Sequence, residues 1–339
     1  MEVSSLGEFG LIRHLTDNIQ LKNQSSIKGV GDDAAVINYG NKSETLVSTD
    51  LLLEGIHFDL TYVPLKHLGY KSAIVNFSDI YAMNGIPKQI TVSLGVSKRF
   101  SVEDLEDFYE GLQLACDIYG VDIVGGDMSS SLTGFCISIT CIGEGQKNKI
   151  TYRNGAKEND LICVSGDLGA AYMGLQLLER EKMAFNGEKD FTPDFAGKEY
   201  LLERQLKPEA RKDIIQFLAE KNIVPTSMID ISDGLSSELL HVCHESKVGC
   251  RIYEERIPID YQTASMAEQF NMNLTTVALN GGEDYELLFT VPLSLNETVS
   301  EIEGITIIGH VCAPDLKAGL ITRDGNEIEL KAQGWTMEN

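Results

Sequence analysis

The spacing of apolar positions changes repeatedly along the first half of the chain between the periods of strands and helices. Short runs rich in β-branched residues predict strands over 45–49, 90–96, 121–124 and 135–143. The first of these strands is expected to end at Asp50, and the third to run into Gly125-Gly126-Asp127. Apolar residues at helical spacing predict a mostly buried helix over 65–83. A second helix is expected after Ser101, which forms a capping-box pattern with Asp104.

The second half repeats this alternation and predicts a second unit of the same class. Strands are predicted over 161–166, 285–291 and 305–311, with a hairpin turn at Asp324-Gly325. Helices are predicted over 168–179, from Pro208 to about Asn222, and after an acidic turn at 230–234, whereas 181–199 is polar and loop-like. The polar stretch 143–160 is the best candidate for a domain junction. The pattern therefore predicts a two-domain α/β or α+β protein, divided into residues 1–150 and 151–339.

The composition is that of an ordinary globular protein, with 43% hydrophobic and 23% charged residues among 339. The formal net charge of −23 disfavours nucleic acid and anionic membranes as partners, and no Lys/Arg cluster provides a local basic patch. No apolar stretch approaches the ~20 residues of a membrane helix, and we expect no signal peptide. The seven cysteines form no Cys-x-x-Cys pair, which favours free thiols in a reducing cytoplasm.

Several acidic residues lie where solubility does not explain them, at predicted strand ends, on glycine turns or in an apolar run. They are Asp33, Asp50, Asp79, Asp127, Asp230, Asp233, Glu283 and Asp284. Taken singly, each is most often a turn residue or a helix cap, and Ser232 with Asp233 would cap the helix that follows them. Asp79 is different, because the apolar helical run around it needs no cap. Asp32 and Asp33 also repel each other, so burying them requires a counter-charge.

A shared divalent cation is the counter-charge that this pattern favours. An isolated buried carboxylate tends to protonate, whereas several that share one hard cation remain ionised. Magnesium prefers oxygen ligands and usually binds through a few carboxylates together with substrate phosphates. The acids therefore predict a magnesium site.

Three other patterns are weaker indications of chemistry. His241, Cys243 and His244 suggest zinc, but no second ligand pair accompanies them. The glycine turn 165–171 enters a helix and suits either an anion or simple packing, because it lacks the full phosphate-loop pattern. On residue type alone, His57 is more often a satisfied buried histidine than a ligand.

Taken together, the motifs resemble those of the thiamine-monophosphate kinase family, whose superfamily includes aminoimidazole ribonucleotide synthetase. The resemblance covers nearly the whole chain. Its motifs are "GEFGLI" (7–12), "GDDAAV" (31–36), "STD" (48–50), "EGIHF" (54–58), "VNFSDIYAM" (75–83), "GGD" (125–127), "YRNGA" (152–156), "DISDGL" (230–235), "GGEDYELLFT" (281–290) and "GW" (334–335). The chain departs from the family at Met128, where a hydroxyl residue is frequent, and at Asn84, where glycine is usual.

The resemblance implies roles for residues in these motifs. The implied magnesium ligands are Asp33, Ser48, Thr49, Asp50, Asp79, Asp127, Asp230 and Asp233. Of these, the catalytic acids would be Asp33, Asp50, Asp79, Asp127 and Asp230. ATP would meet Tyr109, Gly126, Asp127, Arg153 and Ser232. The thiamine moiety would contact His57, Glu283 and Trp335, although the residues alone equally allow Trp335 to pack against its own domain.

The resemblance also implies a fold and a reaction. The chain would adopt the aminoimidazole ribonucleotide synthetase-like α/β (α+β) fold, with its N-terminal sheet pairing across a homodimer. The reaction would transfer a phosphoryl group in line from ATP to thiamine phosphate, giving ADP and thiamine diphosphate. The acceptor oxygen is already largely ionised near neutral pH, so no strong general base is required. The obstacle is repulsion between two polyanions, which several Mg²⁺ ions and Arg153 would offset.

Other readings of the same acids remain open. A selenophosphate synthetase-like enzyme would carry a reactive Cys and a Lys near its N-terminus, and "MEVSSLGEFGLIRHL" has neither. A hydrogenase-maturation-like enzyme would end in a functional cysteine, whereas this chain ends in "GWTMEN". A non-catalytic nucleotide- or cation-binding protein would keep the acids without turnover, and an acidic structural protein would have no site at all.

Overall fold

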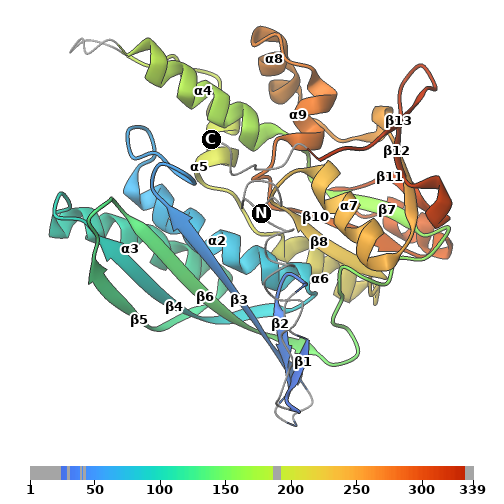
Figure 1. The fold of residues 1–339 in the computed structure, drawn as a ribbon, viewed down its shortest axis with the longest axis horizontal. Helices are drawn as coiled ribbons and strands as arrows, with labels where there is room; N and C mark the ends of the chain where they lie inside the picture. Colours follow the sequence, from blue (N-terminus) through green and yellow to red (C-terminus); the bar gives the residue numbers. More distant parts are fainter. Residues whose placement is uncertain (1–23, 29–30, 39, 41–42, 186–191, 333–339) are drawn as a thin grey trace, which may run out of the picture.

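The computed structural model describes residues 24–28, 31–38, 40, 43–185 and 192–332, whose strands form two sheets (Figure 1). The first sheet has the strand order β1-β2-β3-β6-β4-β5. These strands are β1 (Ser26–Lys28), β2 (Ala35–Ile37), β3 (Ser43–Leu53), β4 (Ile86–Val96), β5 (Asp122–Ser130) and β6 (Cys136–Gln146). Neighbouring strands are antiparallel except β4 and β5, which run parallel.

Two helices, α2 (Leu65–Ala82) and α3 (Val102–Tyr119), pack on one face of the first sheet (Figure 1). On β3 the side chains alternate between the faces. Ser48 and Leu52 are buried on the helix side, whereas Thr49 and Leu51 are exposed on the outer side. α2 is buried on nearly all its surface, because it contacts both the first sheet and strand β8 (Ser227–Ile231) of the second.

The second sheet has the strand order β13-β12-β9-β11-β7-β10-β8. Its strands are β7 (Leu161–Ser165), β8 (Ser227–Ile231), β9 (Gly249–Tyr253), β10 (Glu286–Val291), β11 (Ile305–Cys312), β12 (Ala318–Ile321) and β13 (Glu327–Glu329). The described helices of this half are α4 (Ala170–Ala184), α5 (Glu199–Leu206), α6 (Lys212–Glu220), α7 (Leu235–Ser246), α8 (Tyr261–Gln269), α9 (Leu274–Asn280) and α10 (Asn296–Ser300).

The second sheet separates two hydrophobic cores. Leu161 and Cys163 of β7 pack in a core that also contains residues of α2 and of the first sheet. Ile162 and Val164, which alternate with them, pack in a second core with α7. A shared core of this kind fixes α2 between the two sheets, where its side chains can reach residues of both.

The structure confirms the α/β (α+β) fold class, the buried helix at 65–83 and the capping box of Ser101 and Asp104. All seven cysteines lie in the described part of the chain, and none of them forms a disulfide. None of the described helices is long and apolar enough to span a membrane. The division into domains at residue 150 stays a prediction.

Some predicted boundaries were wrong. β3 continues to Leu53, past Asp50, because it pairs with β6 along its whole length. The segment 181–199 contains the end of α4 and the start of α5, and the helix expected at Pro208 begins only at Lys212.

The strand predicted over 121–124 is also longer than expected, because β5 continues through Gly125-Gly126-Asp127 to Ser130. The parallel strand β4 approaches so closely that a Cβ on Gly126 would lie 1.9 Å from the carbonyl oxygen of Val92. The glycine therefore allows the close pairing of β4 and β5.

Candidate active site

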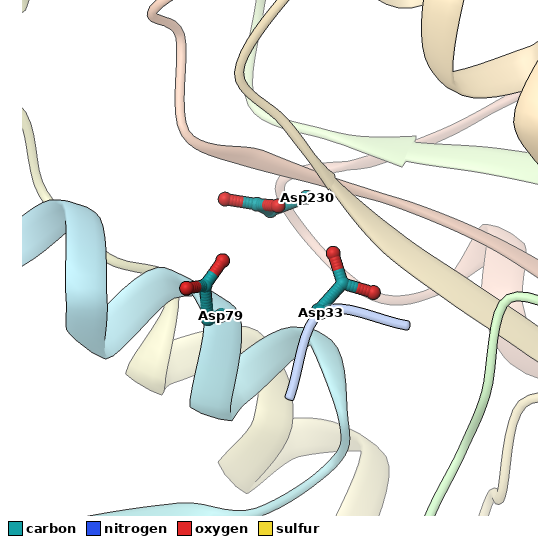
Figure 2. Close-up of side chains that lie close together, drawn as sticks. All are labelled: Asp33, Asp79 and Asp230. Atoms are coloured by element: carbon teal, nitrogen blue, oxygen red, sulfur yellow. The ribbon is translucent and has the colours of Figure 1, made fainter. Parts of the chain in front are cut away.

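Three carboxylates from distant parts of the sequence meet between the two sheets (Figure 2). Asp33 lies just before β2, Asp79 in the last turns of α2, and Asp230 on β8. One carboxylate oxygen of each lies within 4.8 Å of the others. The three acids come together because α2 is buried between the two sheets, where Asp79 faces one strand of each sheet.

Hydroxyl groups from β3 and α2 orient two of these acids. Ser48 Oγ on β3 donates to Asp79, and Ser78 Oγ donates to Asp230 Oδ2 at 2.6 Å. Ser48 was predicted from its motif, whereas Ser78 was missed although it directly precedes Asp79 in the sequence. Both hydroxyls leave the remaining carboxylate oxygens available to a ligand.

Burial, together with the proximity of the acids, raises their pKa values. Burial, followed by the charges of Asp50, Asp230 and Asp33, raises the pKa of Asp79 well above its ordinary value. Burial and Asp33 raise the pKa of Asp230 to about 8, and burial raises the pKa of Asp50 to about 6. A cation that binds in place of the protons therefore stabilises these ionised acids. Closely spaced carboxylate and hydroxyl oxygens are the donor set that Mg²⁺ prefers, so the residues present fit this ion.

Arg153 supplies a fixed counter-charge for Asp33. Its Nε and Nη2 donate to the two carboxylate oxygens of Asp33 at 3.0 and 2.9 Å. Its backbone N–H donates to Asp32 at 3.1 Å, and Lys28 Nζ lies 3.4 Å from the other oxygen of Asp32. The adjacent acids therefore have cationic partners within the chain itself, so their burial does not by itself require a metal ion.

The loop between β8 and α7 lies beside the three acids. The N-cap of α7 is Gly234 and no side chain caps this helix, so the capping role considered for Ser232 and Asp233 is not found. Instead, Ser232 O accepts the Glu283 N–H at 2.7 Å, and the Asp233 N–H donates to Glu238 Oε1 at 2.9 Å. Glu238, which sequence reasoning missed, is buried beneath this loop.

His57 and Glu283 form a second polar group near this loop. His57 Nδ1 accepts the Leu53 N–H at 3.0 Å, and burial lowers the pKa of His57 although Glu283 acts in the opposite direction. The Glu283 carboxylate is held by Lys71 at 3.0 Å and by Gln205 at 2.8 Å. Sequence reasoning missed Lys71 and Gln205, because the first lies in an apolar helical pattern and the second follows a stretch interpreted as loop.

Other predicted site residues are not gathered at the acids. The Thr49 side chain donates to Ile139 O and lies beside Thr140 on the outer face of the first sheet, opposite to Ser48. Gly126 and Asp127 are exposed on the edge strand β5. Tyr109 on α3 packs against the Phe108 ring. Trp335 lies outside the described residues.

The weaker patterns have structural explanations. The N–H of Gly169, at the start of α4, donates to Asp284 at 2.8 Å, so the turn at 165–171 binds a carboxylate of its own chain. His244 pairs with Glu245 on the surface and Cys243 is buried. Within the described ranges, the three acids form the sole group of three metal-binding side chains, so no zinc site is found there.

Comparisons with known proteins cover nearly the whole chain. The family model "AIR synthase related protein, N-terminal domain" matches residues 31–144. A thiamine-monophosphate kinase of Aquifex aeolicus is 35% identical, over 93% of this chain and 98% of the relative. One of Bacillus subtilis is 31% identical, over 97% and 99%. The solved structure of AaThiL, from Aquifex aeolicus, complexed with AMPPCP and TMP superimposes with a TM-score of 0.83, at 33% identity and 99% coverage of both chains. With more than 30% identity over almost its full length, the chain belongs to the thiamine-monophosphate kinase family.

Proposed function

We propose that this protein is a kinase that transfers a phosphoryl group from ATP to thiamine phosphate, giving thiamine diphosphate. The relatives that match along nearly the whole chain carry this activity in their name, and the similar structure described above holds an ATP analogue together with TMP. The meeting of Asp33, Asp79 and Asp230 beside Arg153 carries the proposal, because phosphoryl transfer needs charge stabilisation more than acid–base chemistry.

Magnesium ions fit the proposed site, and several are expected. Asp33, Asp79 and Asp230 would hold them together with Asp50 and Ser48, and we extend the proposal to Thr49, Asp127 and Asp233 from their motifs. When bound, the ions would neutralise the negative charge on the phosphates of the two substrates. The close approach of several acids with raised pKa values supports this assignment.

The chain's own residues would orient the nucleotide. Arg153 lies beside the acids with a permanent charge, while Ser232 lies on the adjacent loop; both are proposed to meet ATP phosphates. Tyr109 and Gly126 are proposed to contact ATP on the strength of their motifs. The acceptor is a phosphate oxygen that is already ionised near neutral pH, so the transfer proceeds in line without a general base.

The His57–Glu283 group is proposed to bind the thiamine moiety, with Trp335 stacking on one of its rings. Because Nδ1 of His57 accepts the Leu53 N–H, the neutral ring carries its proton on Nε2 and can donate there. A lowered pKa keeps His57 uncharged near neutral pH, which avoids repelling the cationic thiazolium ring. The Glu283 carboxylate offers the negative charge that this ring attracts.

We further propose that two chains pair through the outer face of the first sheet. α2 and α3 cover one face only, and no other described helix covers the opposite face, where Leu51 is 52% exposed. Thr49 and Asp127 belong to this uncovered side of the sheet, so a second copy would bring further groups to them. The seven free thiols support a cytoplasmic location for the enzyme.

The test is an assay of the purified protein with ATP, Mg²⁺ and thiamine phosphate, with detection of ADP and thiamine diphosphate. We expect ADP release to depend on thiamine phosphate and to stop in excess EDTA. ATP binding without turnover would instead favour a nucleotide-binding protein, and ATP turnover that does not depend on thiamine phosphate would favour another enzyme of the superfamily.

A further inference from the structure

The Glu283 carboxylate is held on both oxygens by residues of two different helices. Lys71 Nζ on α2 lies 3.0 Å from Oε1, and Gln205 Nε2 on α5 donates to Oε2 at 2.8 Å. Lys71 also donates to the backbone carbonyl of Gln205 at 3.0 Å, which closes the arrangement. The carboxylate is therefore fixed in position, while its unused lone pairs can still accept a hydrogen bond.

Three energetically unfavourable features meet at this carboxylate. Glu283 has a φ of +57°, which a non-glycine residue adopts at a cost. Lys71 is an ammonium group with only 6% of the residue exposed. The Oε1 of Gln205 is buried without a hydrogen-bond partner in the part of the chain that the structure describes. Unfavourable features that persist together are typical of functional sites rather than of positions selected for stability.

We propose that Lys71 and Gln205 are positioning residues that hold Glu283 for contact with the thiamine moiety. This inference rests on the proposed function, in which Glu283 and His57 bind that part of the substrate. Lys71 and Gln205 would strengthen the binding of thiamine phosphate equally in the ground state and in the transition state. Their loss should therefore raise KM for thiamine phosphate and leave KM for ATP nearly unchanged.

A purely structural role for Lys71 makes a different prediction. Gln205 lies in the last turn of α5, where helix carbonyls lack partners within the helix. If Lys71 served only to bind this carbonyl and tie α2 to α5, its loss would lower the melting temperature. The two KM values would then change together or not at all.

The experiment compares Lys71→Met, Glu283→Gln and the double variant. We expect Lys71→Met to raise KM for thiamine phosphate about 10-fold or more. In the Glu283→Gln background the same change should add less than about twofold, because Lys71 acts through Glu283. Lys66→Met is the matched control, since Lys66 is on the same helix in an exposed ion pair with Glu110. The proposal would be overturned if the two single changes in KM multiply in the double variant, or if Lys71→Met leaves KM for thiamine phosphate unchanged.

Two further measurements keep the test decisive. If Lys71→Met does not fold, Gln205→Leu removes the other hydrogen bond while keeping the ammonium, and the same selective rise in KM is expected. If the unmodified protein shows no turnover, the proposed function fails. Calorimetric titration with thiamine phosphate then still decides whether Lys71 and Glu283 act together in binding this ligand.

Discussion

The guanidinium group of Arg153 donates to both carboxylate oxygens of Asp33, across 120 residues of sequence, at 3.0 and 2.9 Å. Asp33 in turn lies within 4.8 Å of Asp79 and Asp230. A permanent positive charge thus lies at the edge of a negative cluster, which is the arrangement needed where cations and phosphates meet.

Replacing Arg153 by lysine should test the geometry of this pair separately from its charge. Lysine keeps the positive charge but cannot donate two parallel hydrogen bonds to one carboxylate. Charge-assisted hydrogen bonds contribute about 1.5–3 kcal/mol, so we expect kcat/KM to fall roughly 10- to 100-fold. Steady-state kinetics with either substrate varied would measure this. Kinetics equal to those of the unmodified enzyme would show that the paired geometry has no part in catalysis.

Asp79→Asn should abolish turnover while the protein stays folded, and Asp50→Asn should do the same. Each substitution removes a negative charge from a crowded, partly buried group, so the metal-free protein should unfold at the same or a higher temperature. The loss of an oxygen ligand for Mg²⁺ explains the lost activity.

The matched control for these variants is Asp117→Asn, at an exposed position on α3. It should leave both activity and melting temperature unchanged. Full activity of Asp79→Asn, or unabated turnover of the unmodified protein in excess EDTA, would contradict the assignment of the acids as metal ligands.

The raised pKa of Asp230 predicts a pH-dependent stability. A carboxyl group with a higher pKa in the folded state than in the unfolded chain binds its proton more tightly when folded, so the free energy of unfolding falls as pH rises. For Asp230, the free energy of unfolding should fall between pH 3.8, which is the ordinary pKa of the group, and about pH 8, which is its pKa in the folded protein. Its contribution should be on the order of a few kcal/mol.

The measurement is thermal unfolding between about pH 5 and pH 8 in EDTA and in Mg²⁺. In EDTA, the melting temperature of the unmodified protein should fall further below that of Asp230→Asn as pH rises. Mg²⁺ should stabilise the unmodified protein more at the upper end of this range, because it binds the ionised acids. A difference that stays constant with pH would contradict the raised pKa.

The spacing of residues within one helix or strand was enough to predict the parts of the site that lie in a single element. Asp79 was singled out because an acid in an apolar helical run needs a tertiary explanation, and the structure places it between two sheets. The period of a strand also implies that Ser48 and Asp50 share a face and that Thr49 does not. Asn84, where the family usually has glycine, has a φ of +56°, which asparagine tolerates better than most residues.

The remaining features depend on contacts between segments far apart in sequence. Nothing near Asp33 indicates that Arg153 is its partner, and nothing in α2 indicates that Lys71 meets a glutamate of the second half. The strand was predicted to end before Gly125, because a glycine needed for close strand pairing has the same local sequence signal as a glycine that ends a strand. The uncovered outer face of the first sheet could be recognised only once the positions of α2 and α3 were known.

Leu51→Asp should separate the two chains of the proposed homodimer. Leu51 is 52% exposed on the outer face of the first sheet, where an unpaired carboxylate buried against a second copy would cost at least about 2 kcal/mol. Light scattering after size exclusion should give the mass of two chains for the unmodified protein and a shift toward one chain for the variant. Val102→Asp is the control, because Val102 is 69% exposed in the first turn of α3, where a negative charge is tolerated. A single-chain mass for the unmodified protein would contradict the pairing.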